Sequence, residues 1–258
     1  MMWRHTVLAL LFGALALPAA AAPNLAVSPS SAAAIAAHLV VDGIATQYGP
    51  AAEASGGASG PYDNRIDVAH LNDTVAVYPS LPAQAIGVKA QDLKSEAAST
   101  GIQTDSVSTR SKASLGAIST SLEYLSFGNI LVPAPVLTIT GRDIHSDTSV
   151  STVFPNSSVG MGGANIASLK IAGTLLKGLS LNYAGVPKPN TVIYDSPTMT
   201  VTLNRQIRAG IISCTPQCTF TLTMMTTDAV AITLNKAVWG SQKVSGEIDL
   251  GETNVSSP

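Results

Sequence analysis

The sequence predicts an all-β fold, most simply an antiparallel β-sandwich, from two observations. Residues typical of a pleated strand, Thr, Val, Ile, Tyr and Leu, gather in 191–203 and 219–234. Turn-forming pairs rich in Gly, Pro, Asp and Asn separate such runs along the chain and leave little room for long helices. We therefore expect many short strands joined by tight turns.

A third observation keeps a second architecture open. Three stretches look alike, because each places an apolar run, a proline-containing bend and an alternating run in the same order. They are 73–94, 128–145 and 190–207. An internal repeat of this kind would fit a β-solenoid, although any all-β chain repeats strand, turn and strand.

The N-terminus has the pattern of a secretory signal peptide. Arg4 precedes an apolar run, Val7–Leu17, and small residues follow up to Ala21. This run is shorter than the roughly 20 residues of a membrane-spanning helix. We expect cleavage after residue 21, a single secreted or periplasmic β-rich domain over 22–258, and no membrane span within it.

Composition excludes two classes of protein. With 46% hydrophobic and 12% charged residues, the chain does not fit charge-rich disorder. Its 14 Lys and Arg residues against 16 Asp and Glu residues do not build the positive field that nucleic-acid binding requires. We therefore expect no nucleic-acid partner.

Three segments and one residue of the chain can be interpreted individually. Ser30–Val41 reads either as an alanine-rich helix or as a strand ending at Asp42-Gly43, and a helix is also possible over Ala164–Leu176. The Gly-, Ala- and Ser-rich segment Ala51–Asp63 is typical of an exposed loop. Trp239, near a strand end, is expected to cover the core.

The clearest hairpin spans Arg208–Thr226. Cys214 and Cys218 flank its turn, and in an oxidising compartment such a pair predicts a local disulfide that clamps the hairpin tip. A redox or metal role for this pair lacks the spacing and the additional ligands.

The most suggestive polar cluster is Asp143, His145 and Asp147. Side chains spaced by two residues on a strand project from one face, so these three could converge on a cation or flank a proton transfer. The polar outer face of a sheet gives the same spacing. Asp63 and Asp67, a second acidic pair, are more typical of turn chemistry.

Motifs for nucleophilic or cofactor chemistry are missing from the sequence. No G-x-S-x-G elbow occurs, and the glycine run Gly160–Gly163 lacks the third glycine of a dinucleotide-binding loop. We therefore assign no catalytic residue and no cofactor.

A resemblance adds to this interpretation. The segment 164–206 contains Ser168–Gly173 (SLKIAG), Pro189-Asn190 and Thr202–Gln206 (TLNRQ). In these motifs, and in the order of its serine-rich strands, the chain resembles the choice-of-anchor P family of exported bacterial proteins. That resemblance implies an exported β-rich domain and carries over no catalytic residues.

The functional expectation is a non-enzymatic envelope or extracellular protein with a surface-interaction or structural role, whose partner is an unidentified surface or protein. Two alternatives stay open: a secreted hydrolase, and a calcium-assisted ligand-binding protein. Both would use a site around Asp143 and His145.

Overall fold

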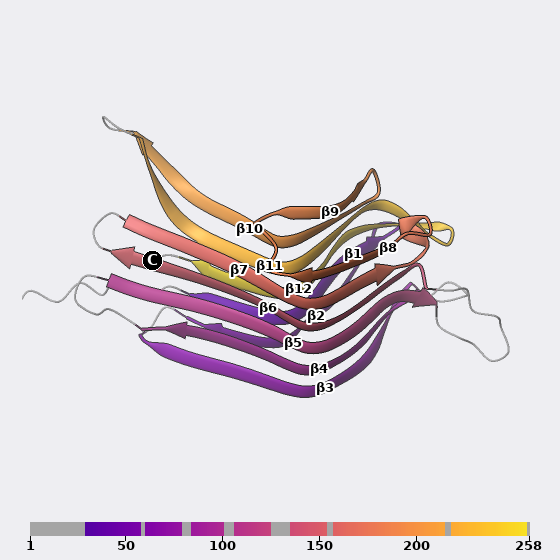
Figure 1. Cartoon of the computed structure of the whole chain (residues 1–258), viewed down its shortest axis with the longest axis horizontal. Helices are drawn as coiled ribbons and strands as arrows, with labels where there is room; N and C mark the ends of the chain where they lie inside the picture. Colours follow the sequence, from indigo (N-terminus) through magenta and orange to yellow (C-terminus); the bar gives the residue numbers. More distant parts are fainter. Residues whose placement is uncertain are drawn as a thin grey trace, which may run out of the picture.

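A computed structural model describes residues 29–57, 60–78, 84–100, 106–124, 135–153, 157–214 and 218–256. These residues form two six-stranded sheets that pack face to face (Figure 1). All strand pairs within the described ranges are antiparallel. The predicted all-β sandwich is confirmed, and the β-solenoid alternative is wrong because its stacked coils would pair in parallel.

The first sheet, sheet A, has the order β2-β1-β12-β11-β10-β9. Its strands are β1 (Ser30–Val41), β2 (Ile44–Gly56), β9 (Thr191–Ser196), β10 (Met199–Cys214), β11 (Cys218–Trp239) and β12 (Gln242–Ser256). Strand β1 pairs with β12, so the two ends of the described chain lie side by side.

The second sheet, sheet B, is a continuous meander in the order β3-β4-β5-β6-β7-β8. Its strands are β3 (Tyr62–Tyr78), β4 (Gln84–Ser99), β5 (Ser106–Tyr124), β6 (Leu137–Val153), β7 (Ser157–Ala172) and β8 (Ser180–Gly185), with a 3-10 turn, η1 (Thr174–Leu176), before β8. The chain crosses between the sheets after β2 and after β8. Strands β3 and β8 are therefore the edges of sheet B.

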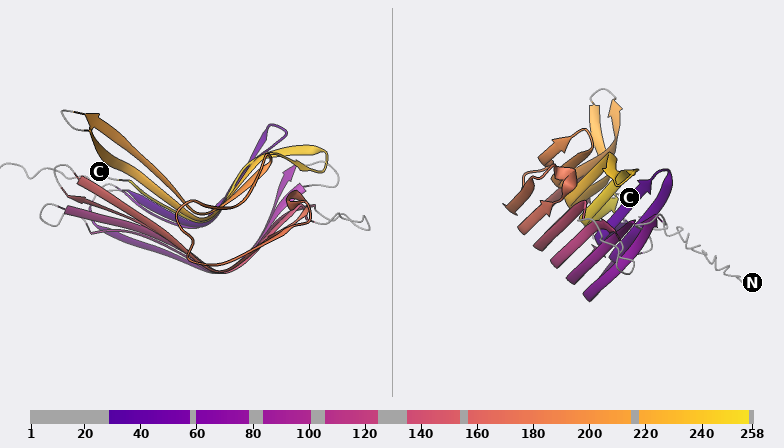
Figure 2. Two further views of the ribbon diagram at one scale, coloured as in Figure 1. Left: turned by 45° about the horizontal axis from the view of Figure 1, so that its top comes forward. Right: turned by 90° about the vertical axis from the view of Figure 1, so that its right-hand side faces the viewer.

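Both sheets bend sharply along a line that crosses their strands, and sheet A lies on the inside of the bend (Figure 2). Pairing along this line is interrupted for one residue on five strands of each sheet. These residues are Ala52, Ala34, Gly251, Ala229 and Asn204 in sheet A, and Ala69, Asp92, Gly116, Asp143 and Ala167 in sheet B.

The cause of the bend is a left-handed residue on every second strand. Backbone φ is +51° at Ala52, +62° at Gly251 and +49° at Asn204 in sheet A, and +51° at Asp92 and +45° at Asp143 in sheet B. Such a residue redirects a strand, and Gly, Asn and Asp tolerate the conformation best. The strands between them have Ala or Gly at the position where they cross the bend.

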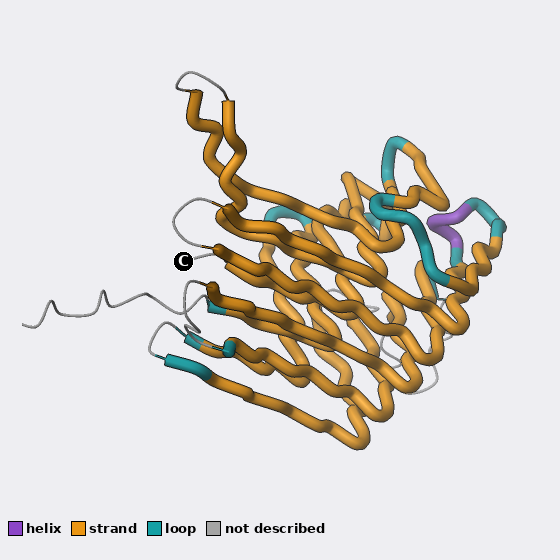
Figure 3. Tube along the Cα trace, turned by 60° about the vertical axis from the view of Figure 1, so that its left-hand side comes forward, coloured by secondary structure: helices purple, strands orange, loops and turns teal. Residues whose placement is uncertain are grey.

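The bend divides the sandwich into two arms (Figure 3). The residues buried in the two arms differ. The half that contains Ser106–Leu115 and Ile144–Val153 is called the hydroxyl arm, and the half that contains Ala117–Tyr124 and Leu137–Arg142 is called the apolar arm. Buried side chains of the hydroxyl arm include Ser95, Ser99, Thr109, Ser111, Thr148, Thr152, Thr227 and Thr253. Those of the apolar arm include Leu122, Ile139, Ile171, Ile232 and Trp239.

Hydrogen bonds between the sheets satisfy part of the hydroxyl arm. The Oγ1 atoms of Thr148 and Thr253 lie 2.7 Å apart, and Thr253 also donates to the carbonyl oxygen of Thr227 at 2.9 Å. Since a paired hydroxyl costs little to bury, this arm can be filled by small polar residues. Most large apolar side chains lie at the bend and in the apolar arm.

The alanine-rich segment Ser30–Val41 is strand β1, not a helix, and it lies between β2 and β12. Ala33 and Ala36 project from the outer face of sheet A yet are 6% and 1% exposed. They lie on the inner side of the bend, where they line a small hollow together with Pro50, Glu53 and Glu252. Pairing and close packing therefore override the helix propensity of alanine.

Three other local predictions need correction. In the segment Ala164–Leu176, residues Ala164–Ala172 belong to β7, and only η1 is helical. Ala51–Gly56 is the end of β2 rather than a loop. Asp63 and Asp67 lie in β3 rather than in a turn, and Asp63 accepts hydrogen bonds from the guanidinium of Arg65.

The hairpin at Arg208–Thr226 is confirmed, because β10 and β11 pair up to Cys214 opposite Cys218. Their side chains and residues 215–217 lie outside the described part of the chain, so the disulfide stays a prediction. Trp239 is fully buried, as expected, with its ring edge-on to Tyr124 at 6.3 Å. Among the described residues, no helix is long and apolar enough to cross a membrane.

Candidate functional site

Asp143, His145 and Asp147 do not form a common site. Asp143 is one of the left-handed residues of the bend and is exposed on its outer side. His145 and Asp147 follow on the outer face of the hydroxyl arm, also exposed. The backbone requirement at the bend accounts for an aspartate at position 143 without any chemistry.

His145 and Asp147 line a shallow hollow of about 400 Å³. Its charged side chains are mixed in sign: Arg65, Lys94 and Lys112 with Asp67, Glu96 and Asp147. Asp147 lies opposite Lys112 in the ladder. Desolvation raises the pKa of Asp147, and the charge of Lys112 opposes this shift.

Metal binding at this cluster gains no support. Within the described ranges, no group of three or more His, Cys, Asp or Glu side chains is arranged to hold a metal ion. The metal and hydrolase hypotheses for Asp143, His145 and Asp147 therefore stay predictions.

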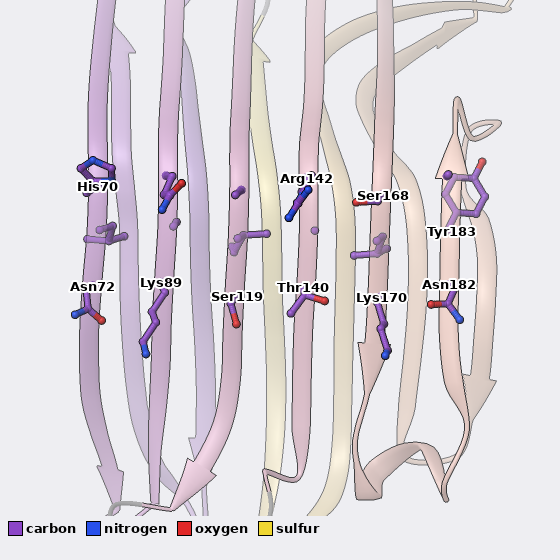
Figure 4. Close-up of a pocket in the computed structure, with 18 residues that line it drawn as sticks. His70, Asn72, Lys89, Ser119, Thr140, Arg142, Ser168, Lys170, Asn182 and Tyr183 are labelled. Carbon is purple, nitrogen blue, oxygen red and sulfur yellow. The ribbon is translucent and has the colours of Figure 1, made fainter.

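A larger groove lies on the outer face of the apolar arm of sheet B (Figure 4). It has a volume of about 990 Å³ and receives residues from all six strands of the sheet. Because it runs from the edge strand β3 to the edge strand β8, it is open at both ends. We call it the cationic groove.

Strand register arranges the groove side chains in two rows that cross the strands. One row is His70, Gln91, Ala117, Arg142 and Ser168 on β3 to β7. The other is Asn72, Lys89, Ser119, Thr140, Lys170 and Asn182 on β3 to β8. Successive strands lie about 4.8 Å apart, and the two rows are two residues apart along each strand.

The floor of the groove is the backbone of these strands. Between the two rows lie Ala90, Ile118 and Leu169, which point into the core and are 4%, 4% and 3% exposed. Ala117 leaves the centre of the first row open because it has no side chain beyond Cβ. The groove therefore offers polar side chains above an apolar core that stays covered.

The charge of the groove has one sign. Lys89, Arg142 and Lys170 are exposed, and none forms an ion pair with any described residue. No aspartate or glutamate occurs among the described residues that line it. With donors on Asn, Gln, Ser and Thr beside three cations, the groove can bind anionic groups by charge and hydrogen bonding.

Sheet A carries a mainly acidic cluster on the inner side of the bend, in contrast to the cationic groove. Arg205 donates from Nε to Asp228 Oδ2 at 2.7 Å and from Nη2 to Asp249 Oδ1 at 3.1 Å, and it also pairs with Glu247. Burial raises the pKa of Asp228 to about 6, against the opposing effect of Arg205. Burial and the charge of Asp228 raise the pKa of Asp249 to about 8.

Sequence reasoning missed the cationic groove because its residues are scattered over six strands. Lys89 and Lys170 are far apart in the chain and become members of one row only through strand register. The signal available was weak: polar residues at alternate positions, such as Lys89 with Gln91 and Thr140 with Arg142. That spacing indicates which side chains of one strand face outward, but it does not show which residues of other strands lie beside them.

Comparison of the chain with family models, with curated proteins and with solved structures finds no match. The likeness to the choice-of-anchor P family is neither supported nor contradicted by this result.

Proposed function

We propose that this protein is a non-enzymatic envelope or extracellular protein that binds an anionic surface through the cationic groove. The observation that carries the proposal is the set of three exposed cations, Lys89, Arg142 and Lys170, without an acidic partner among the described residues. Export follows from the signal peptide expected at residues 1–21.

Two features of the groove support binding rather than catalysis. It is shallow and open at both ends, whereas a reaction centre excludes water and holds its groups rigidly. His70, at the end of the first row, has no carboxylate beside it among the described residues that line the groove, so no acid–base pair is assembled there.

Matched charged and neutral polymers test the proposal. Dextran sulfate and uncharged dextran are immobilised at equal density, and binding of residues 22–258 is measured by surface plasmon resonance over a range of salt concentrations. We expect binding to dextran sulfate that weakens as salt rises, and little binding to dextran, because exposed charges are screened.

Two variants with the same change in net charge locate the binding site. Lys89→Gln/Arg142→Gln/Lys170→Gln removes the cations of the groove. Lys94→Gln/Lys112→Gln/Lys243→Gln removes three exposed cations outside the groove, two from the hydroxyl arm of sheet B and one from sheet A. We expect a loss of roughly tenfold or more in affinity for the first variant and a much smaller loss for the second. Equal losses of affinity would show that net charge alone drives binding and that the groove is not the binding site.

A further inference from the structure

We infer that the ligand of the cationic groove is an extended anionic glycan that lies across the strands of sheet B, along its two rows of side chains. This inference rests on the proposed function and names its ligand. It depends on the direction of the rows, the spacing of the cations and the kinds of side chain between them.

The direction follows from the register. Both rows run perpendicular to the strands, and the second extends over all six strands, from Asn72 on β3 to Asn182 on β8. Five strand spacings give a length of about 24 Å. Because β3 and β8 are edges, a longer chain can leave the groove at either end.

The cations are spaced for a chain rather than for a single anion. Lys89 on β4 and Lys170 on β7 belong to the same row and are three strands apart, about 14 Å between backbones. Arg142 stands between them in the neighbouring row, on β6. One small anion can reach one of these groups well, whereas a polymer with several anionic groups can engage all three at once.

The side chains between the cations favour a glycan. Ser119 and Thr140 lie between Lys89 and Lys170. In the first row Ser168 is next to Arg142, and Gln91 lies beyond Ala117 on its other side. Amides and hydroxyls both donate and accept hydrogen bonds, which suits the hydroxyl groups of a sugar chain.

Three other polyanions fit less well: duplex DNA, single-stranded nucleic acid and a membrane surface. Duplex DNA carries one charge per about 1.7 Å, far denser than three cations over the groove. A single strand would require aromatic stacking platforms, but Tyr183, the aromatic residue among the described lining residues, packs against the core. A membrane surface would require apolar side chains pointing outward, whereas Ala90, Ile118 and Leu169 point inward.

The test uses galacturonate oligomers of increasing length as the anionic glycan. Binding of the monomer, dimer, tetramer and octamer to residues 22–258 is measured by isothermal titration calorimetry at low salt. Fully methyl-esterified oligomers serve as uncharged controls. Single-stranded oligothymidylate and vesicles of phosphatidylglycerol provide the other polyanions, and dextran sulfate provides a reference for the proposed function.

The inference predicts that affinity rises steeply with length until the chain spans both lysines. It also predicts that Lys89→Gln and Lys170→Gln each weaken octamer binding about tenfold or more. Neither substitution should affect the monomer comparably, because the monomer cannot use both lysines. Lys94→Gln and Lys112→Gln, on the other arm, should leave octamer binding within about twofold of the wild type.

The failures of the two proposals differ. If octamer and monomer bind equally per anionic group, or if only one lysine matters for the octamer, the crosswise chain is overturned while the groove keeps its role. Binding of oligothymidylate or vesicles without binding of the octamer overturns the glycan. No binding of any polyanion overturns the proposed function and this inference with it. Circular dichroism melts of each variant show that it is folded.

Discussion

The guanidinium of Arg205 reaches across the bend of sheet A to Asp249, with Nη2 3.1 Å from Oδ1. Arg205 lies on the hydroxyl-arm side of the bend residue Asn204, whereas Asp249 lies on the apolar-arm side of Gly251. The same guanidinium also binds Asp228, on its own side of the bend. One side chain thus joins the two arms on the inner face of the bend.

Replacement of Arg205 should destabilise the protein. Arg205→Gln leaves Asp228, whose side chain is 0% exposed and whose pKa of about 6 keeps it ionised at neutral pH, without its cation. Breaking a buried pair by removing one partner costs about 3 kcal/mol or more. Urea denaturation at neutral pH measures the free energy of unfolding, with the exposed Arg208→Gln as control. A loss no larger than that of the control would show that Arg205 does not hold the bend.

The raised pKa of Asp249 predicts a pH dependence. Above about pH 4 the unfolded chain has released the proton of an ordinary aspartate, whereas the folded protein keeps it until its pKa of about 8. The folded state therefore binds more protons in this window, and its stability falls as pH rises from about 4 to 8.

Asp249→Asn removes this titration. We expect the decline in unfolding free energy over that window to become shallower, by up to about 1.4 kcal/mol per pH unit. Glu252, Glu247, Asp228 and Arg205 remain around the site in the variant. Urea denaturation at several pH values measures the slope, with Asp67→Asn on an exposed strand as control. An unchanged slope would mean that Asp249 is ionised throughout.

Substitutions at Asp143 test whether this residue is needed for the backbone of the bend. Its φ of +45° is strained for a β-branched residue, so Asp143→Val should cost about 1 to 2 kcal/mol and Asp143→Gly should be tolerated. His145→Val, two residues away in the same strand, is the control, because valine suits an extended strand there. If Asp143→Val and His145→Val had equal thermal stability, the bend would not depend on this position.

Glycine in β7 allows the two sheets to approach closely. A Cβ at Gly162 would lie 2.1 Å from Thr227 Oγ1 and 2.8 Å from Met225 Cε on β11. Gly162→Ala should therefore cost about 1 to 3 kcal/mol through overpacking. Gly163→Ala is the matched control, because its Cβ would meet only the side chain of Asp147, at 3.2 Å. Equal melting temperatures of the two variants in thermal melts would contradict this close packing.

The sandwich could be predicted from the sequence because strand propensity and turn residues are local signals. The hairpin at Cys214 and Cys218 and the burial of Trp239 followed from the same signals. Strand β1 could not be assigned, since its five alanines favour a helix until the bend of sheet A is known. The bend itself depends on single left-handed residues, such as Asp143, whose alignment across strands is set by register.

The candidate site was harder to predict than the fold. The close spacing of Asp143, His145 and Asp147 in the sequence predicts a shared site, yet Asp143 lies at the bend and the other two lie beyond it on the hydroxyl arm. Lys89, Arg142 and Lys170 lie on three different strands and meet only in the folded sheet. A site built by register across a meander leaves no compact motif in the chain.

The most direct test of the account is the affinity of two charge-matched variants for dextran sulfate. Lys89→Gln/Arg142→Gln/Lys170→Gln should lose roughly tenfold or more relative to Lys94→Gln/Lys112→Gln/Lys243→Gln, because only the first variant empties the groove of cations. Equal affinity of the two variants would contradict the assignment of the groove as the binding face of this protein.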